Sequence, residues 1–295
     1  MIDRSTSIFE ENRSLLEGLA YRMLGTLADA QDIVQDTYIQ WLNTNLQEIQ
    51  NERAWLITVC SRLSLNQLQA AKVKREAYFG VWLPDPLVTK SEEGDASVLI
   101  ELDESVSVAL MLALEQLTPT ERAVYILYEV FNYKFTDIAQ FIGKNSDNCR
   151  KLATRARARI IERKPRFKPS IEEHHSLLHG FFSAVREGRM DELKNLLSES
   201  IELHSDGGGR VQAAEHVLCG ADLVASFFAD IWADYASKGI EINILAQQYN
   251  GAPGALIFEN KSITTAISMD VEEGKIKRIY GLRNPDKLSA FAALQ

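Results

Sequence analysis

The strongest constraint in this chain is a change of hydrophobic period near two prolines, Pro165 and Pro169. Before them, apolar residues recur about every 3.6 positions, as in amphipathic helices. After them, a few helical stretches alternate with segments in which every second residue is apolar, as in strands. A single domain would be unusual for 295 residues. The sequence therefore predicts helical modules followed by a separate α+β domain.

The helical part divides at a linker. Helices are expected at about 6–24, 28–42 and 52–78, and Gly25 is placed to end the first of them. Residues 79–97 contain two prolines and two glycines and then turn acidic, which breaks the helical period. Helices resume at about 98–116, 119–131, 135–142 and 146–163. Thr118, Pro119 and Glu121 form a strong helix start, with a capping threonine, proline at the first position and glutamate at the third.

Beyond residue 169, helices are expected at about 171–186, 191–197 and 220–237. Strands are expected at 201–205, 210–213, 241–249, 255–259, 262–271 and 275–282. This order indicates helices packed on a curved antiparallel sheet. The expected divisions are 1–78, a linker at 79–97, 98–168 and 169–295.

The net charge of −9 argues at first against a nucleic-acid partner. The charge is unevenly distributed, however. Residues 1–168 hold 21 Lys and Arg against 23 Asp and Glu, a net charge of −2, whereas residues 169–295 hold 11 against 18, a net charge of −7. Residues 144–168 contain ten basic and only two acidic side chains. This basic run is typical of a surface that binds phosphate.

The segment 135–155 has the pattern of a helix-turn-helix. Ala139 provides the small residue where two helices cross, Gly143 suits the turn, and Cys149 is the apolar anchor. Ser146 is expected to cap the second helix. The exposed positions of that helix are suited to base edges and phosphates: Asp147, Asn148, Arg150, Lys151 and Arg155. The alternative is a helical hairpin with a solvated basic face.

Three ordered motifs between residues 117 and 159 resemble region 4 of extracytoplasmic-function (ECF) sigma factors: Leu117-Thr-Pro-Thr-Glu-Arg122, Phe135-Thr-Asp-Ile-Ala-Gln-Phe-Ile-Gly143 and Arg155-Ala-Arg-Ala-Arg159. Three earlier motifs resemble sigma region 2: Tyr21-Arg-Met-Leu-Gly25, Asp29-Ala-Gln-Asp-Ile-Val-Gln-Asp-Thr-Tyr38 and Arg53-Ala-Trp-Leu-Ile-Thr-Val59. The resemblance implies an alternative sigma factor that directs core RNA polymerase to promoters, contacting the beta-prime clamp and the beta flap.

The resemblance also implies sites. The minus-35 element would be read by Ser146, Asp147, Asn148, Arg150, Lys151 and Arg155. The polymerase clamp would contact Asp32, Gln35 and Asp36. A loop at 43–51 would capture a minus-10 base, and basic side chains would follow the melted strand: Asn43, Asn45, Asn51, Arg53, Arg62, Lys72, Lys74 and Arg75. Core packing is the expected role of Trp41 and Trp55.

The C-terminal part resembles a SnoaL-like domain, a curved-sheet cone that often encloses a pocket. Three motifs match the sigma subgroup that carries such an extension, in which they form a regulatory interface. The motif residues are Trp82, Leu83, Pro84, Asp85 and Pro86; Asp206, Gly207, Gly208, Gly209 and Arg210; and Asn284, Pro285 and Lys287. The expected result is intramolecular contact with the sigma regions. A plain hairpin turn is the alternative for the three glycines.

An enzyme or a small-molecule receptor is another hypothesis for this domain, because SnoaL-like folds hold pockets and all five histidines lie here. His175 and His179 have the spacing of a helical metal pair, but no third ligand is evident. No nucleophile, base and orienting group are recognisable either. No enzyme activity, metal or cofactor is therefore expected, and a small-molecule ligand stays open.

The chain has no apolar stretch long enough for a membrane span, so a cytoplasmic protein is expected. The alternative function is a ligand-sensing helix-turn-helix regulator that binds duplex DNA without polymerase.

Overall fold

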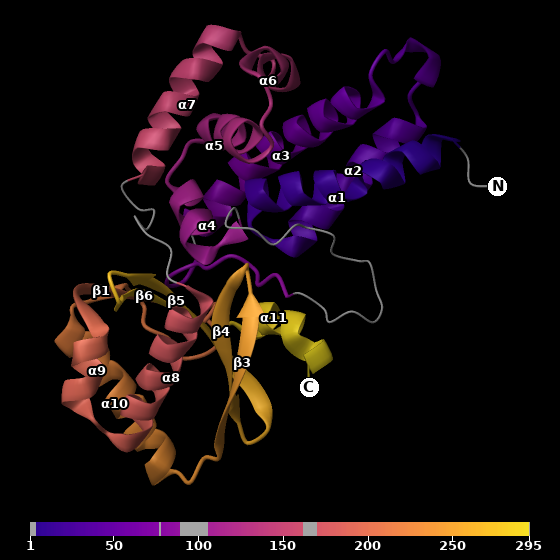
Figure 1. Cartoon of the computed structure of the whole chain (residues 1–295). Coiled ribbons are helices and arrows are strands. Elements are labelled where there is room, and N and C mark those ends of the chain that lie inside the picture. Colours follow the sequence, from indigo (N-terminus) through magenta and orange to yellow (C-terminus); the bar gives the residue numbers. More distant parts are fainter. Residues whose placement is uncertain (1–3, 77, 89–105, 162–169, 295) are drawn as a thin grey trace. The chain divides into compact units, whose positions relative to one another are not determined.

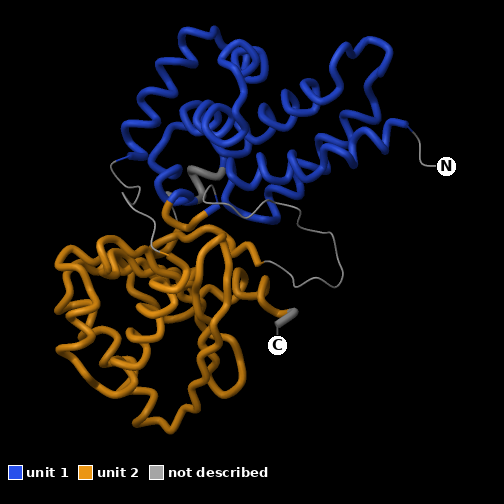
Figure 2. The backbone as a smooth tube through the Cα atoms, in the orientation of Figure 1, with its two compact units in different colours: residues 1–77, 90–106, 110–164 blue, residues 78–89, 107–109, 165–295 orange. Residues whose placement is uncertain are grey.

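The computed structural model describes residues 4–76, 78–88, 106–161 and 170–294. They form two compact units, and each is a fold of its own (Figure 1, Figure 2). Unit 1 comprises residues 1–77, 90–106 and 110–164, and unit 2 comprises 78–89, 107–109 and 165–295. The described part of the expected linker, 79–88, thus folds with the C-terminal part, and so does Tyr78, which was assigned to the first domain. Residues 89–97 lie outside the described residues.

Unit 1 begins with three helices, α1 (Arg4–Leu24), α2 (Leu27–Leu42) and α3 (Glu52–Glu76), with a short 3₁₀ turn, η1 (Leu46–Glu48), before α3. Gly25 ends α1 as expected, with a φ of 74° and its N–H donating to the Tyr21 carbonyl over 2.6 Å. Trp41 is fully buried, and its indole N–H donates to the Ser5 carbonyl over 2.8 Å. The core role predicted for Trp41 is confirmed.

The rest of unit 1 consists of α4 (Val108–Glu115), α5 (Pro119–Tyr125), a π-helical turn η3 (Ile126–Val130), α6 (Phe135–Ile142) and α7 (Ser146–Ile161). The predicted capping box is confirmed, because Thr118 and Glu121 exchange side-chain and backbone hydrogen bonds. Gly143 ends α6 in the left-handed conformation, with a φ of 65°. The helix-turn-helix seam is buried as expected; its residues are Ile138, Ala139, Ile142, Cys149 and Leu152.

The predicted cap of α7 was wrong by one residue. Asn145, not Ser146, caps the helix, because its side-chain oxygen accepts the Asn148 N–H over 2.8 Å. The Ser146 hydroxyl is buried and has no hydrogen-bond partner among the described atoms. Asparagine before a helix is as strong a cap as serine, so the choice depends on which backbone turns into the helix first.

A group of basic and acidic side chains joins the helices of unit 1. Glu115 pairs with Arg75 of α3 and with the buried Arg122 of α5. Arg122 also donates to the Arg22 carbonyl at the end of α1 over 3.0 Å. Burial raises the pKa of Glu115, but the two guanidinium groups outweigh it and hold that pKa below its ordinary value. Glu115 is therefore ionised within this contact.

In unit 2, the helices between residues 171 and 237 cover one face of a curved sheet (Figure 1). The helices of unit 2 are α8 (Ile171–Glu187), α9 (Met190–Leu196), α10 (Ala221–Ser237), α11 (Pro285–Leu288) and the 3₁₀ turn η4 (Ser289–Leu294). Its strands are β1 (Leu197–Asp206), β2 (Leu218–Cys219), β3 (Ile242–Tyr249), β4 (Ala252–Glu259), β5 (Ser262–Glu272) and β6 (Lys275–Leu282). The described strands lie in the order β2-β1-β6-β5-β4-β3, with β1 and β6 parallel.

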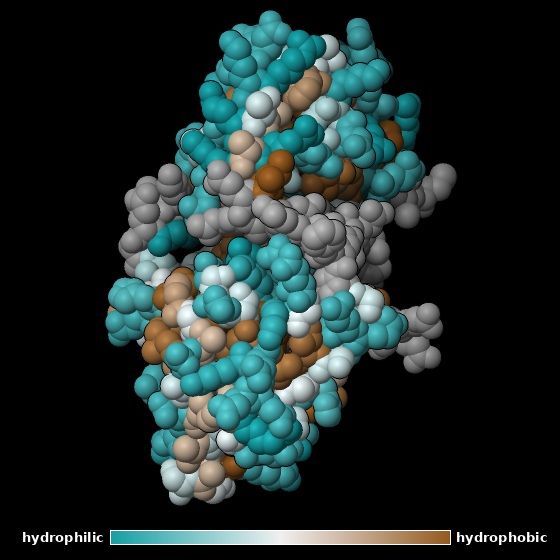
Figure 3. All heavy atoms as spheres, turned by 60° about the vertical axis from the view of Figure 1, so that its left-hand side comes forward, coloured by the Kyte–Doolittle hydropathy of each residue, from teal (hydrophilic) through white to brown (hydrophobic). Residues whose placement is uncertain are grey.

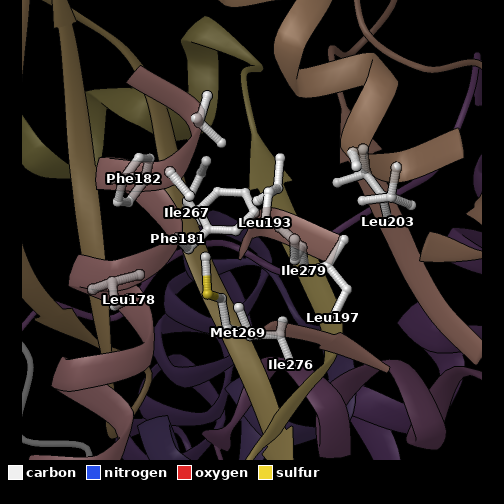
Figure 4. Close-up of a cluster of buried hydrophobic side chains, with 14 of the residues drawn as sticks. Leu178, Phe181, Phe182, Leu193, Leu197, Leu203, Ile267, Met269, Ile276 and Ile279 are labelled. Carbon is white, nitrogen blue, oxygen red and sulfur yellow. The ribbon is translucent and has the colours of Figure 1, made fainter. Parts of the chain in front are cut away.

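The core of unit 2 lies between the sheet and α8, α9 and α10 (Figure 4). Phe181 is central: its ring meets Phe182 and Phe228 edge to face, with ring centroids 5.4 and 4.9 Å apart.

The strand expected at 210–213 was wrong. The N–H groups of Arg210 and Val211 donate instead to the Gly207 carbonyl, which closes a turn. Among the described helices, none combines the length and apolar character that crossing a bilayer demands.

The cap assignment of α7 is testable. Replacing Asn145→Ala removes the side-chain acceptor and is expected to lower the free energy of unfolding by about 1 kcal/mol. Ser146→Ala removes only a buried hydroxyl without a partner, so the free energy should stay the same or rise slightly. Urea unfolding followed by circular dichroism compares the two variants. A larger loss for Ser146→Ala would show that serine is the cap.

Candidate nucleic-acid interface and linker latch

The exposed face of α7 carries most of the residues predicted to read DNA. Five residues spread over about two helical turns are all exposed: Asp147, Asn148, Arg150, Lys151 and Arg155. Ser146 is half-buried and its hydroxyl is buried. Arg150 donates to Asp147 over 2.8 Å, and both side chains are more than half exposed, so the pair is weak and can open to a phosphate or base.

Arg155 has a second role that the sequence did not indicate. Its guanidinium donates to Glu121 of α5 over 3.1 Å, and Arg159 donates to the same carboxylate over 2.6 Å. Burial raises the pKa of Glu121, but hydrogen bonds from Thr118 and Arg155 outweigh it and hold the pKa below its ordinary value. The buried carboxylate therefore orients α7 against α5 while leaving its outer face open.

The residues predicted to contact the polymerase clamp lie together on α2. Asp32, Gln35 and Asp36 are all exposed and follow the i, i+3, i+4 spacing of one helix face. The same face continues into two exposed apolar side chains, Ile39 and Leu42, with 48% and 51% of their surface accessible. Sequence reasoning missed these two, although their spacing from Asp32 could have indicated them.

The predicted minus-10 loop is shaped by its own asparagines. The Asn43 side chain donates to the Ile39 carbonyl, Asn45 caps η1, and Asn51 accepts the Ala54 N–H at the start of α3. All three are exposed at the surface of the loop, and Arg53 beside it is exposed as well. The asparagines thus fix the local backbone of the loop and present polar groups at its surface.

Two of the other basic residues predicted for this site, Arg62 and Arg75, have partners elsewhere in unit 1. Arg62 donates to the carbonyls of Gln140 and Phe141 at the end of α6, over 3.3 and 3.2 Å. Arg75 is only 14% exposed and pairs with Glu115. The side chains of Lys72 and Lys74 lie outside the described residues.

In unit 2, the three motifs predicted to form a regulatory interface do meet. Their centre is Asp206, whose carboxylate is fully buried. It accepts from the Tyr78 hydroxyl over 2.6 Å, the Leu83 N–H over 3.0 Å and Lys287 over 2.8 Å. Asn284 donates to Tyr78 over 3.0 Å. We call this set, Tyr78, Leu83, Asp206, Asn284 and Lys287, the latch.

Other motif residues surround the latch. Lys287 lies over the Trp82 ring, with its ammonium 4.6 Å from the centroid. Pro84 and Pro86 are buried and Asp85 is half-buried, whereas Pro285 is exposed. Arg210 joins Asp286 over 3.0 Å at the surface. The Tyr78 hydroxyl keeps its proton, because burial and its bond to Asp206 raise the pKa of Tyr78 well above its ordinary value.

The glycines of this loop are required by close approach. Gly208 has a φ of 64°, donates its N–H to Asp206 over 3.0 Å, and would place a Cβ 2.4 Å from the Asn284 amide nitrogen. A Cβ on Gly207 would lie 2.4 Å from the Val211 carbonyl oxygen. Gly209 has a φ of 68° and faces Phe79. The three glycines therefore fit a packed turn against the linker, not a plain hairpin.

A second contact holds the end of the linker. The Leu87 N–H donates to the Asn250 side chain over 2.9 Å, and the Asn250 N–H donates back to the Leu87 carbonyl over 2.8 Å. Val88 pairs with Tyr249 as a single antiparallel bridge. Sequence reasoning missed Tyr78, Leu87 and Asn250. Only Asn250 carried a signal, since asparagine before glycine tolerates its φ of 49°.

Among the histidines of unit 2, His175 and His179 of α8 line one groove. His174 is buried, and burial lowers its pKa to about 4. His204 lies 3.0 Å from Glu202 on the sheet. In the part of the chain that the structure describes, no three His, Cys, Asp or Glu side chains are grouped as metal ligands would be.

Comparison with known proteins agrees with this geometry. Residues 8–73 match the family description Sigma-70 region 2, and residues 107–160 match Sigma-70, region 4. SigI of Mycobacterium tuberculosis (strain ATCC 25618 / H37Rv), described as a probable ECF RNA polymerase sigma factor, is 32% identical and covers 99% of this chain and 97% of its own length. SigJ of the same strain, an ECF RNA polymerase sigma factor, is 32% identical over 96% of this chain and 93% of its own.

The crystal structure of Mycobacterium tuberculosis SigJ matches the whole architecture, with a TM-score of 0.78 at 29% identity, covering 96% of this chain and 98% of that one. A helix-turn-helix joined to a second helical module of region 2 type defines a sigma factor. The chain belongs to the ECF RNA polymerase sigma factor family. The predicted fold, two helical sigma modules followed by an α+β domain with a curved sheet, is confirmed. A regulator that is not a sigma subunit is disfavoured.

The geometry of the latch predicts that the charge of Asp206 contributes strongly to the free energy of unfolding. Asp206→Asn leaves Lys287 buried without its carboxylate, which is expected to lower the free energy of unfolding by about 3 kcal/mol. The matched control is Asp286→Asn, whose partner Arg210 is exposed, so the change should stay within about 0.5 kcal/mol. Urea unfolding followed by tryptophan fluorescence measures both. Equal losses would show that Asp206 does not hold the latch.

Proposed function

We propose that this chain, as an alternative sigma factor, binds core RNA polymerase and directs it to promoters through three surfaces of unit 1. The α7 face reads the minus-35 duplex with Asp147, Asn148, Arg150, Lys151 and Arg155. The α2 face with Asp32, Gln35 and Asp36 binds the beta-prime clamp, and the beta flap contacts the region 4 module. The loop at 43–51, with Asn43, Asn45, Asn51 and Arg53, captures a melted minus-10 base.

One observation supports this proposal most directly. The α7 residues suited to contact DNA are exposed, while Glu121, which holds α7 in place, is buried. Arg and Asn side chains that reach base edges in the major groove discriminate bases by about 1–3 kcal/mol each. Arg155 and Arg159, tied to the buried Glu121, fix the angle of the helix that presents them. A positioned reading helix is what sequence-specific binding requires.

We also propose that unit 2 regulates these surfaces in cis by holding the linker. The linker residues 78–88 belong to unit 2 and are fixed at Asp206 and at Asn250. The charged groups at Asp206 are satisfied by the latch itself, which favours a regulatory contact over catalysis. The protein would act in the cytoplasm, where it meets polymerase and promoter.

Reversing charge on α7 tests the DNA-reading role. Arg150→Glu is expected to lower promoter-specific run-off transcription with core polymerase by at least tenfold, because it replaces a donor to bases or phosphates with a repelling charge. Lys238→Glu is the matched control, since Lys238 is also exposed and paired with an acid on its own helix, Asp234. Pull-down of core polymerase should be equal for both variants. Unchanged transcription from Arg150→Glu would reject the proposal.

The α2 face has its own test. The double variant Ile39→Ser and Leu42→Ser removes exposed apolar area next to the acidic residues and should weaken binding to core polymerase about tenfold. Both side chains are half exposed, so the unfolding free energy should stay within about 0.5 kcal/mol of the parent value. Fluorescence anisotropy with labelled core measures the affinity. Full-strength binding would show that α2 contacts the polymerase by another face.

Regulation in cis is tested in the full chain. Asp206→Asn, compared with Asp286→Asn at equal concentrations of folded protein, should change run-off transcription at least threefold. A change in either direction supports control through the linker. Equal output from the two variants would reject it while leaving the sigma function in place.

A further inference from the structure

Unit 2 contains a cavity between α8, α10 and the concave face of the sheet. Its volume is about 50 Å³. The apolar lining includes Phe182 of α8, Phe228 and Trp232 of α10, and Leu203, Ile257 and Ile267 of the sheet. A cavity lined by such side chains stays dry and accepts apolar groups. As it stands, this one holds only a small group, about a third of a cavity that binds benzene.

The wall formed by α10 is the side of the cavity that can adjust. Phe227, Phe228, Ile231 and Trp232 are all half-buried, whereas the sheet residues that face them are buried. Hydrophobic side chains (brown) also gather between hydrophilic ones (teal) in the lower, unit 2 part of Figure 3. A ligand larger than the present cavity therefore has to displace these half-buried α10 side chains and not the buried residues of the sheet.

One end of the cavity is polar. Tyr235 donates to Glu259 over 2.6 Å, Thr264 donates to the same oxygen over 2.7 Å, and Arg283 lies 3.6 Å from it. The Arg283 Nε–H is buried and has no hydrogen-bond partner among the described atoms. Since Glu259 already balances the charge of Arg283, a neutral acceptor suits this donor better than an anion.

We propose that the cavity binds a small, mainly apolar ligand that carries a neutral carbonyl oxygen. The apolar body lies against the aromatic face of α10. The oxygen accepts a hydrogen bond from Arg283, whose donor is otherwise unsatisfied.

The same arginine connects the cavity to the latch. Its backbone N–H donates to the Asp206 carbonyl over 2.7 Å, and its Nη1 donates to the Gln212 carbonyl over 2.6 Å. Ser205 and Ala213 also line the cavity, and they flank the glycine turn on either side. A ligand that fixes Arg283 therefore stabilises the turn that holds the linker. This step rests on the latch geometry and not on promoter activity.

The binding test uses the full chain and the neutral naphthyl ketone dye Prodan as the probe. One saturable site with blue-shifted emission is expected. Acetophenone should displace the dye at least tenfold better than ethylbenzene, which has a similar shape but no oxygen. Arg283→Met should weaken Prodan binding at least tenfold, and Ile231→Trp, which fills the cavity from its adjustable wall, should do the same.

Arg186→Met is the matched control, because Arg186 does not line the cavity but lines a neighbouring groove of about 420 Å³, on the other side of Phe182. The affinity of the Arg186→Met variant for Prodan should equal that of the parent chain. Loss of binding in Arg186→Met, or equal binding by all the variants, would overturn the proposal by placing the dye outside the cavity.

The exchange rates of linker amides then test whether a ligand in the cavity stabilises the latch. Prodan should slow exchange of the Leu83 and Leu87 amides, which donate to Asp206 and Asn250, at least threefold. Arg283→Met should lose this protection at saturating dye. Bound dye without slower exchange would overturn the connection to the latch and would leave the promoter function untouched.

Discussion

The fold of unit 2 depends on the burial of one carboxylate, Asp206. Removing an ionised carboxylate from water costs several kcal/mol unless donors replace the lost hydration. Here the donors come from three places in the chain: Tyr78 and Leu83 of the linker, Gly208 of the adjacent turn, and Lys287 of α11. If any of these segments moved away, the buried Asp206 carboxylate would lose one or more of its hydrogen-bond donors. The linker is consequently part of the domain and not a free tether.

Unit 1 uses a similar arrangement at Glu115, which joins α3 to α5 through Arg75 and Arg122. Arg62 adds a contact between α3 and the end of α6. Arg62 and Arg75, which the sequence suggested as DNA contacts, thus hold the region 2 and region 4 modules together. The Arg62 guanidinium is thus occupied by the carbonyls at the end of α6.

Local signals in the sequence were sufficient for most elements. Gly25, Gly143 and the pair Thr118 and Glu121 fix helix ends through interactions within a few residues, and periodicity fixes which faces are buried. The basic α7 face followed for the same reason. The latch motifs came from resemblance alone, because contacts such as Tyr78 with Asp206 join residues 128 positions apart and leave no local pattern.

The errors have the same origin. Residues 210–213 alternate as a strand would, yet the preceding glycines allow the chain to turn back on Gly207. Arg75 stands among other basic residues and was therefore expected at the surface. Its partner Glu115 lies 40 positions away, and the Arg75 side chain is largely buried beside it. Charge in a sequence shows that a group needs a partner. It does not show whether that partner is a phosphate or a distant carboxylate.

The glycine turn places the linker and the cavity next to each other, which limits how a ligand can act. A ligand that binds equally well whether the latch is closed or open shifts nothing, however tightly it binds. Influence requires a contact that differs between the two states. Arg283 provides one, because its side chain faces the cavity while its backbone and Nη1 hold both ends of the turn. Affinity in the cavity and order in the linker are therefore linked through this residue.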